Sequence, residues 1–208
     1  MNTQLYIKKE TDDPFFINEK NGLICKAVLI GEPEGKRNLI ENFYKTFKLS
    51  FFKQPLGGDF VTKEIYLEKE QSFVNIQIWD TTGQEQFKSI GKSFYRNTDV
   101  FLLVYVKSEK TTFESIKKFW YKEVINYASD NTIFVLVGYK DEMIEYEEVS
   151  EEEGKAYAKK INAIFKETDN IEDVFHIIAQ NIKIECLNCL KKNKLLKKDN
   201  NIKKKGCF

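Results

Sequence analysis

Five segments of the chain have the apolar patterns of β-strands. Residues 23–30, 100–106 and 132–138 are nearly continuous apolar runs, of the kind that buried parallel strands require. Residues 59–67 and 73–79 flank a short polar stretch, which predicts an antiparallel hairpin. The pattern therefore predicts a sheet that is mostly parallel.

Apolar residues between these runs recur at helical spacing. Leu39, Ile40, Phe43 and Phe47 mark a first helix, and the residues from Phe113 to Tyr127 mark a second. Two further helices are predicted over 151–160 and 171–190. Strands that alternate with helices predict an α/β fold with helices on both faces of the sheet.

Ligands of such sheets bind beyond the carboxyl ends of the strands. Gly31, Asp80 and Gly138 fall at those ends. We expect the functional site at this edge.

Size and cysteine content favour one cytosolic domain. A chain of 208 residues with 42% hydrophobic content can bury one core. No apolar N-terminal run resembles a signal peptide, no segment is apolar enough to span a bilayer, and the four cysteines follow no secreted framework. We expect an N-terminal extension over 1–22, a domain over 23–190 and a tail over 191–208.

The tail is basic and the rest of the chain is acidic. Eight lysines and one aspartate give residues 191–208 a charge of +7, which leaves −6 on residues 1–190. Such a tail suits an anionic membrane surface, although a solvated lysine-rich end has the same composition. The acidic body argues against nucleic acid as a partner.

The segment from Gly31 to Arg37 lies where a strand meets a helix, as a phosphate-binding loop does. Such a loop aims backbone N–H groups at phosphates and adds a lysine and a hydroxyl that binds Mg²⁺. Gly31, Gly35 and Lys36 fit that pattern, but only three residues separate the glycines and Arg37 replaces the hydroxyl. Taken alone, the segment also fits an ordinary strand-to-helix turn.

Four segments, in order, resemble Rab-type small GTPases of the Ras superfamily. They are Leu-Gly-Gly-Asp-Phe at 56–60, Ile-Gln-Ile-Trp-Asp-Thr-Thr-Gly-Gln-Glu-Gln-Phe at 76–87, Phe-Tyr-Arg at 94–96 and Leu-Val-Tyr at 103–105. The resemblance extends from about residue 25 to 175. It implies a P-loop NTPase fold with a six-stranded sheet, GTP or GDP and Mg²⁺ as cofactors, and a role in vesicle and protein transport.

The resemblance also implies roles for particular residues. Asp80 matches the aspartate near Mg²⁺, Gly83 the glycine that faces the γ-phosphate, and Gln84 the glutamine that orients the attacking water. An aromatic triad matches the surface through which Rab proteins contact effectors, although a core role is an equal alternative. The triad consists of Phe60, Trp79 and Phe94.

Other positions depart from the family pattern. Pro55 replaces the switch I threonine, so it offers neither a hydroxyl nor an amide. In the base-recognition segment Lys140 matches, but Tyr139 replaces an asparagine and Glu142 an aspartate. The loop that usually covers the base is missing after Thr168. Arg37 and Pro55 replace the two residues whose hydroxyl groups bind Mg²⁺ in the family. We expect the Arg37 guanidinium to lie near this metal position, where it either pairs with Asp80 or supplies the positive charge that Mg²⁺ would otherwise give. The alternative is that Arg37 faces solvent.

The carboxyl terminus resembles a Rab tail without its usual cysteine pair. Cys207 is a candidate for single prenylation, which anchors a protein only marginally unless lysines add a second signal. Cys186 and Cys189 have zinc-ligand spacing without a second pair, and a structural or acylated pair is the alternative.

Three functions remain open at this point. The chain is a GTP-binding switch with slow hydrolysis, a pseudo-GTPase that binds proteins, or a membrane adaptor that uses its tail. In each case we expect a monomer on the cytosolic face of endomembranes, with Rab-type effectors and regulators as partners.

Overall fold

The computed structural model describes residues 23–47, 59–67, 71–80, 94–140 and 146–182, with only the backbone for 42–47 and for residue 59. Its strands are β1 (Leu23–Gly31), β2 (Asp59–Leu67), β3 (Ser72–Asp80), β4 (Val100–Val106), β5 (Ile133–Tyr139) and β6 (Ile164–Thr168). Its α-helices are α1 (Pro33–Phe47), α3 (Lys110–Ser115), α4 (Tyr121–Val124), α5 (Glu151–Lys160) and α6 (Ile171–Asn181). A π-helical turn, η1 (Ile116–Trp120), joins α3 to α4, and a 3₁₀ turn, η2 (Ile125–Tyr127), follows α4.

The strands form one six-stranded sheet in the order β2-β3-β1-β4-β5-β6. Only β2 runs antiparallel, paired with β3 in the predicted hairpin. The α/β fold and its mostly parallel sheet are confirmed. The apolar pattern did not indicate β6, which was expected only from the resemblance.

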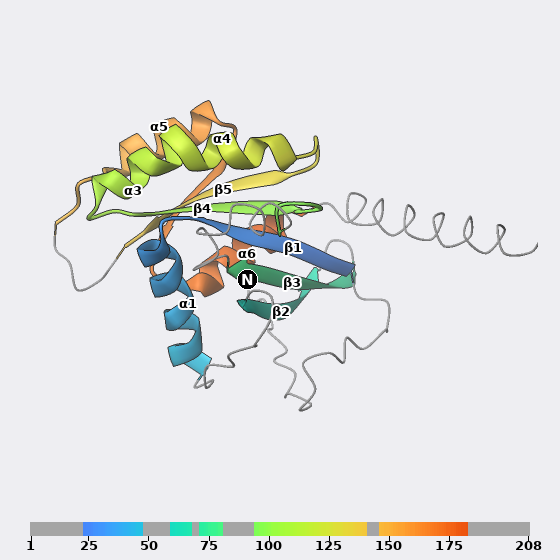
Figure 1. The fold of residues 1–208 in the computed structure, drawn as a ribbon. Helices are drawn as coiled ribbons and strands as arrows, with labels where there is room; N and C mark the ends of the chain where they lie inside the picture. The colour runs from blue at the N-terminus through green and yellow to red at the C-terminus, as the bar shows by residue number, and fades with distance from the viewer. Residues whose placement is uncertain (1–22, 48–58, 68–70, 81–93, 141–145, 183–208) are drawn as a thin grey trace, which may run out of the picture.

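Helices cover both faces of the sheet, as Figure 1 shows. On one face, residues of α1 and α6 pack against Cys25, Ala27 and Leu29 of β1. On the other face, α3, η1, α4 and α5 pack against a core that includes Val28 and Ile30. Because both faces of β1 are buried, its sequence is continuously apolar rather than alternating.

Strand β2 shows the opposite pattern for the same physical reason. Val61 and Ile65 point into the core, whereas Thr62 and Glu64 stand on the uncovered face. The alternation that predicted this strand therefore reflects burial on one side only.

Two helix predictions need correction. The helix predicted over 171–190 is present over Ile171–Asn181 and is interrupted at Ile182, which adopts an extended backbone; residues 183–190 lie outside the described part of the chain. The helix predicted from Phe113 to Tyr127 is not a regular α-helix, because a π-turn and a 3₁₀ turn interrupt it.

Candidate functional site

The carboxyl ends of the parallel strands meet at one edge of the sheet, as predicted. Asp80 ends β3 opposite Leu29 of β1, and Gly31 ends β1 opposite Val104 of β4. Gly138 lies opposite Tyr105, one residue before β5 ends. The structure therefore brings Gly31, Asp80 and Gly138 to the same edge.

A single residue, Glu32, separates β1 from α1, which begins at Pro33. Gly31 has a φ of +142°, and a Cβ there would lie 2.2 Å from the Val104 carbonyl oxygen. Gly31 is therefore required by a sharp turn against β4. A Cβ at Gly35 would lie 3.2 Å from a methyl carbon of Val106, so this glycine lets α1 pack closely on the sheet.

Lys36 is completely buried in the second turn of α1. Its Nζ lies 5.9 Å from the centroid of the Trp120 ring, over the ring. The indole Nε1–H of Trp120 in turn donates to Glu32 Oε1 at 3.0 Å. The lysine, the tryptophan and the glutamate thus gather at the start of α1, where a nucleotide's phosphates would be expected.

Arg37 occupies the next position and is exposed. No acidic side chain pairs with it in the part of the chain that the structure describes. The solvent-facing alternative for Arg37 is therefore the one observed, and the expected pairing with Asp80 is not.

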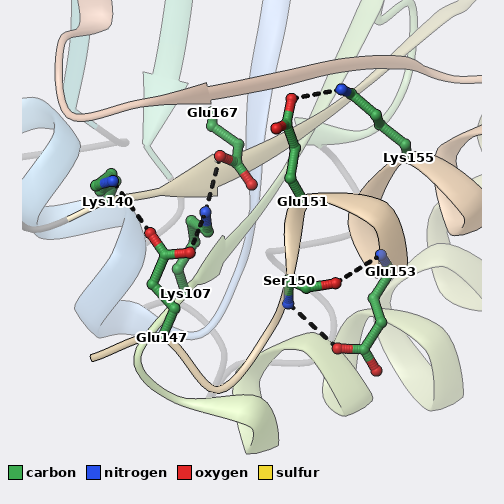
Figure 2. A network of polar contacts seen from close by, with 8 residues as sticks. All are labelled: Lys107, Lys140, Glu147, Ser150, Glu151, Glu153, Lys155 and Glu167. Carbon is green, nitrogen blue, oxygen red and sulfur yellow. Dashed lines mark hydrogen bonds and ion pairs between the residues drawn. The ribbon is translucent and has the colours of Figure 1, made fainter. Parts of the chain in front are cut away.

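Four charged side chains form a chain of ion pairs at the ends of β4, β5 and β6 (Figure 2). Glu147 accepts from Lys107 at 2.7 Å and from Lys140 at 3.1 Å. Lys107 also contacts Glu167 at 2.8 Å, and only 3% of the Lys107 side chain is exposed. We call these four residues the lysine–glutamate chain.

Mutual stabilisation shifts the pKa values within the lysine–glutamate chain. Burial disfavours the charged form of Lys107, but its hydrogen bonds to Glu147 and Glu167 outweigh burial and raise its pKa. Hydrogen bonds from Lys107 and then Lys140 hold the pKa of Glu147 below its usual value. The predicted base-recognition residue Lys140 is therefore engaged by the protein's own carboxylate.

The neighbouring base-recognition position is also changed. Tyr139, in place of an asparagine, is only 5% exposed and packs in the core under α1 and α6. Only Asp169 and Asn170 connect β6 to α6, and the Asn170 side chain caps that helix by accepting from the Glu172 N–H at 2.9 Å. The connection that would cover a base is short and serves as a helix cap.

The predicted aromatic triad lies together at the β2–β3 end of the sheet, where Trp79 and Phe94 pack against the edge of the core on the face that carries α3 and α5. The ring centroids of Phe60 and Trp79 are 4.7 Å apart, and those of Trp79 and Phe94 are 5.9 Å apart. All three side chains are half-buried. Lys26 Nζ holds the segment that carries Phe94, because it donates to the carbonyl oxygen of Phe94 and to that of Arg96.

Several predicted residues lie outside the described part of the chain. They are Pro55, Gly83, Gln84, Glu142, Cys186, Cys189 and Cys207. Their roles stay predictions.

Sequence reasoning missed the parts played by Lys107, Glu147, Glu167 and Trp120. Lys107 could have been found, since a lysine directly after the apolar run 100–106 lies at a strand's carboxyl end. Trp120 was assigned to a helical apolar stripe, and no signal linked it to Glu32.

The described residues do not fit a phosphate chain with its Mg²⁺. Lys36 is inaccessible to solvent, a carboxylate stands between β1 and α1, and Arg37 offers no metal ligand. Among the described residues, no group of three acidic, histidine or cysteine side chains is placed to hold a metal ion. In the same residues no helix is long and apolar enough to cross a membrane.

Known proteins match this chain over most of its length. The family model described as the Ras family matches residues 26–184. The chain is 38% identical over 157 residues to the Ras-related protein RABA6a of Arabidopsis thaliana. The matched residues are 75% of this chain and 66% of RABA6a, so the chain spans slightly less than two thirds of that protein. It is 31% identical over 192 residues to the Ras-related protein RabC of Dictyostelium discoideum, covering 89% of this chain and 97% of RabC. With the Ras-related protein Rab11B of Nicotiana tabacum, it shares 34% identity over 175 residues, which are 80% of this chain and 79% of that protein.

Proposed function

The chain belongs to the Ras family as a Rab-type small GTPase, and from this premise we propose that it is a pseudo-GTPase. It serves membrane trafficking on the cytosolic face of endomembranes. It binds partner proteins through the sheet face that carries Phe60, Trp79 and Phe94, and it binds guanine nucleotide weakly or not at all.

The observation that carries this proposal is the start of α1. The helix begins at Pro33, one residue after the glycine that ends β1, and Lys36 is fully buried. A phosphate-binding loop needs exposed backbone N–H groups and a lysine that can reach the phosphates. Neither the short connection nor the buried Lys36 meets that need.

The other end of the site supports the same function. Glu147 engages Lys140, and Tyr139 is packed into the core. Tight recognition of a purine edge requires side chains that are free to make directional hydrogen bonds. Both side chains instead make their contacts within the protein.

The aromatic triad supplies the protein-binding half of the proposal. Aromatic side chains that are half-buried and already packed against each other lose little side-chain entropy when a partner covers them. They are also the residue type that dominates binding energy at interfaces. Lys26 fixes the backbone of the Phe94 segment, so the surface is preorganised.

A nucleotide assay tests the proposal. The full chain is purified and denatured, and any released nucleotide is identified, after which GTP, GDP and ATP are titrated with and without Mg²⁺. We expect substoichiometric nucleotide and no Mg²⁺-dependent binding at micromolar concentration. Stoichiometric guanine nucleotide would overturn the proposal.

A nucleotide switch is the second candidate. Asp80 does lie at the carboxyl end of β3, the position that a metal-binding aspartate requires. In this candidate, GTP is bound and slowly hydrolysed with Gln84 orienting the water. The nucleotide assay separates the two candidates directly.

A further inference from the structure

The helical segment that follows β4 contains an irregular turn, η1. Within η1, the Tyr121 N–H bonds the Ile116 carbonyl, five residues away, instead of the usual four. A π-turn of this kind is rare, inserts an extra residue into a helix and is frequent at functional sites. The last residue of this turn is Trp120.

The π-turn lies against the strands that end at the candidate site. A Cβ on Gly31 would come within 3.5 Å of Ile116 Cδ1, so the first residue of η1 touches the end of β1. Trp120 is 9% exposed, and its indole nitrogen reaches Glu32 at 3.0 Å. The contact links two segments that are 88 residues apart in sequence.

Glu32 is placed where an anion is favoured. It immediately precedes α1, and the unpaired N–H groups at the start of a helix favour negative charge. The Trp120 ring also lies over the Lys36 ammonium, which is a favourable arrangement for a buried cation. The protein therefore supplies its own anion at this end of the helix and its own cover for the lysine.

We infer that Glu32 and Trp120 form an internal contact that takes the place of a nucleotide's phosphates and sets the low affinity of this site for polyphosphate. We call this contact the Glu32–Trp120 latch. The inference rests on the proposed function and explains its physical cause. The Glu32 carboxylate repels an incoming phosphate chain, and the indole N–H holds that carboxylate in position.

Two variants test the two halves of the latch in the full-length protein. Glu32→Gln removes the charge but keeps an oxygen that can accept from the indole. Trp120→Phe keeps an aromatic ring over Lys36 but removes the N–H donor. Pyrophosphate and GTP are titrated by calorimetry into each variant, and circular dichroism and thermal unfolding check that each one folds.

We expect Glu32→Gln to bind pyrophosphate at least about tenfold more tightly than the wild type, because like charges in close contact are strongly unfavourable. Trp120→Phe keeps the charge but releases the carboxylate to move away, so it should show a smaller gain. The matched control is Glu34→Gln, which makes the same charge change two residues away on an exposed side chain. The control should bind as weakly as the wild type.

Unchanged affinity in folded Glu32→Gln overturns the latch, as does an equal gain in Glu34→Gln. A gain in Glu32→Gln alone overturns the part assigned to Trp120. The proposed function is judged separately by the nucleotide content of the wild type, whereas the latch is judged by the ratio of variant to wild-type affinity.

Discussion

Lys107 carries a positive charge where only 3% of its side chain reaches solvent. Its two carboxylate partners, Glu147 and Glu167, are themselves 32% and 19% exposed. Burial of a charge is costly unless it is paired, so the pairing determines whether this residue stabilises the fold. Removing the lysine leaves both carboxylates without their shared partner.

Lys107→Met should lower the free energy of unfolding by about 3 kcal/mol, because breaking a buried ion pair strands its partners. Urea unfolding measures this change. The matched control is Lys110→Met, since Lys110 and Glu153 form an ion pair in which both side chains are about half exposed. The control should cost less than about 1 kcal/mol, and an equal loss in both variants would contradict the argument.

Glu147 should make the free energy of unfolding depend on pH. Its pKa in the folded protein lies below the ordinary 4.5, through hydrogen bonds from Lys107 and then Lys140. A lowered folded-state pKa stabilises the protein above the unfolded-state pKa, and this contribution is lost as the pH falls through the folded-state value. Glu147→Gln should therefore be less stable than the wild type at pH 7, and the difference should shrink below about pH 4.5.

Urea unfolding at a series of pH values from 7 to 3 measures this difference. Glu109→Gln is the control, because Glu109 is exposed and has no side-chain partner among the described residues. A difference between wild type and Glu147→Gln that stays constant across the series would show that the carboxylate does not act through its charge.

At the scale of elements, close packing between α5 and the sheet depends on one glycine. A Cβ on Gly154 would lie 2.5 Å from the Phe165 ring and 2.7 Å from the Tyr105 hydroxyl. The reciprocal capping of α5 by Ser150 and Glu153, drawn in Figure 2, fixes the start of this helix and limits how far it can move away. An alanine at position 154 should therefore lose more stability through overpacking than it gains through its higher helix propensity.

Gly154→Ala should destabilise the protein by about 1 kcal/mol or more, since overpacking costs about 1–3 kcal/mol and alanine returns up to about 1 kcal/mol of helix propensity. Thermal and urea unfolding measure the change. Phe165→Leu removes the ring that the new methyl group meets, so Gly154→Ala should cost less in that background, where only the close approach to the Tyr105 hydroxyl remains. Additive losses in the double variant would place the strain elsewhere.

The sequence predicted elements where one physical pattern decided the structure. The apolar runs of β1, β4 and β5 and the alternation of β2 were sufficient to predict these strands. A strand that is buried on both faces is continuously apolar, whereas a strand that is buried on one face alternates between apolar and polar residues. Strand β6 was missed, since its residues Ile164–Thr168 include Lys166 and Glu167 and are mostly half-buried at the sheet edge. The π-turn was invisible, because one inserted residue leaves a helical apolar stripe nearly unchanged.

The candidate site was predicted less completely than the fold. Strand ends placed Gly31, Asp80 and Gly138 correctly, because parallel topology determines that edge. The latch and the lysine–glutamate chain join residues that are far apart in sequence, and no local pattern reports such pairings. Glu32 lies within the segment from Gly31 to Arg37 that the sequence singled out, but only the structure shows its contact with Trp120.

At the scale of the whole molecule, the proposed function assigns partner binding to two surfaces. One is the sheet face with the aromatic triad. The other is the tail, with eight lysines and one aspartate over residues 191–208, outside the described part of the chain.

We expect the full chain to bind vesicles that contain anionic lipid, because each lysine near such a surface contributes about 1 kcal/mol. Deletion of residues 191–208 should abolish cosedimentation with these vesicles, and neutral vesicles should bind neither protein. Since screening shortens the range of the attraction, binding by unmodified protein should fall steeply as salt is raised.

Cys207→Ser then separates the contribution of a lipid from that of the lysines. In cells it should weaken membrane association if Cys207 carries a lipid, and in the purified, unmodified protein it should change nothing. Salt-insensitive binding by the unmodified chain would show that the lysines are not the anchor.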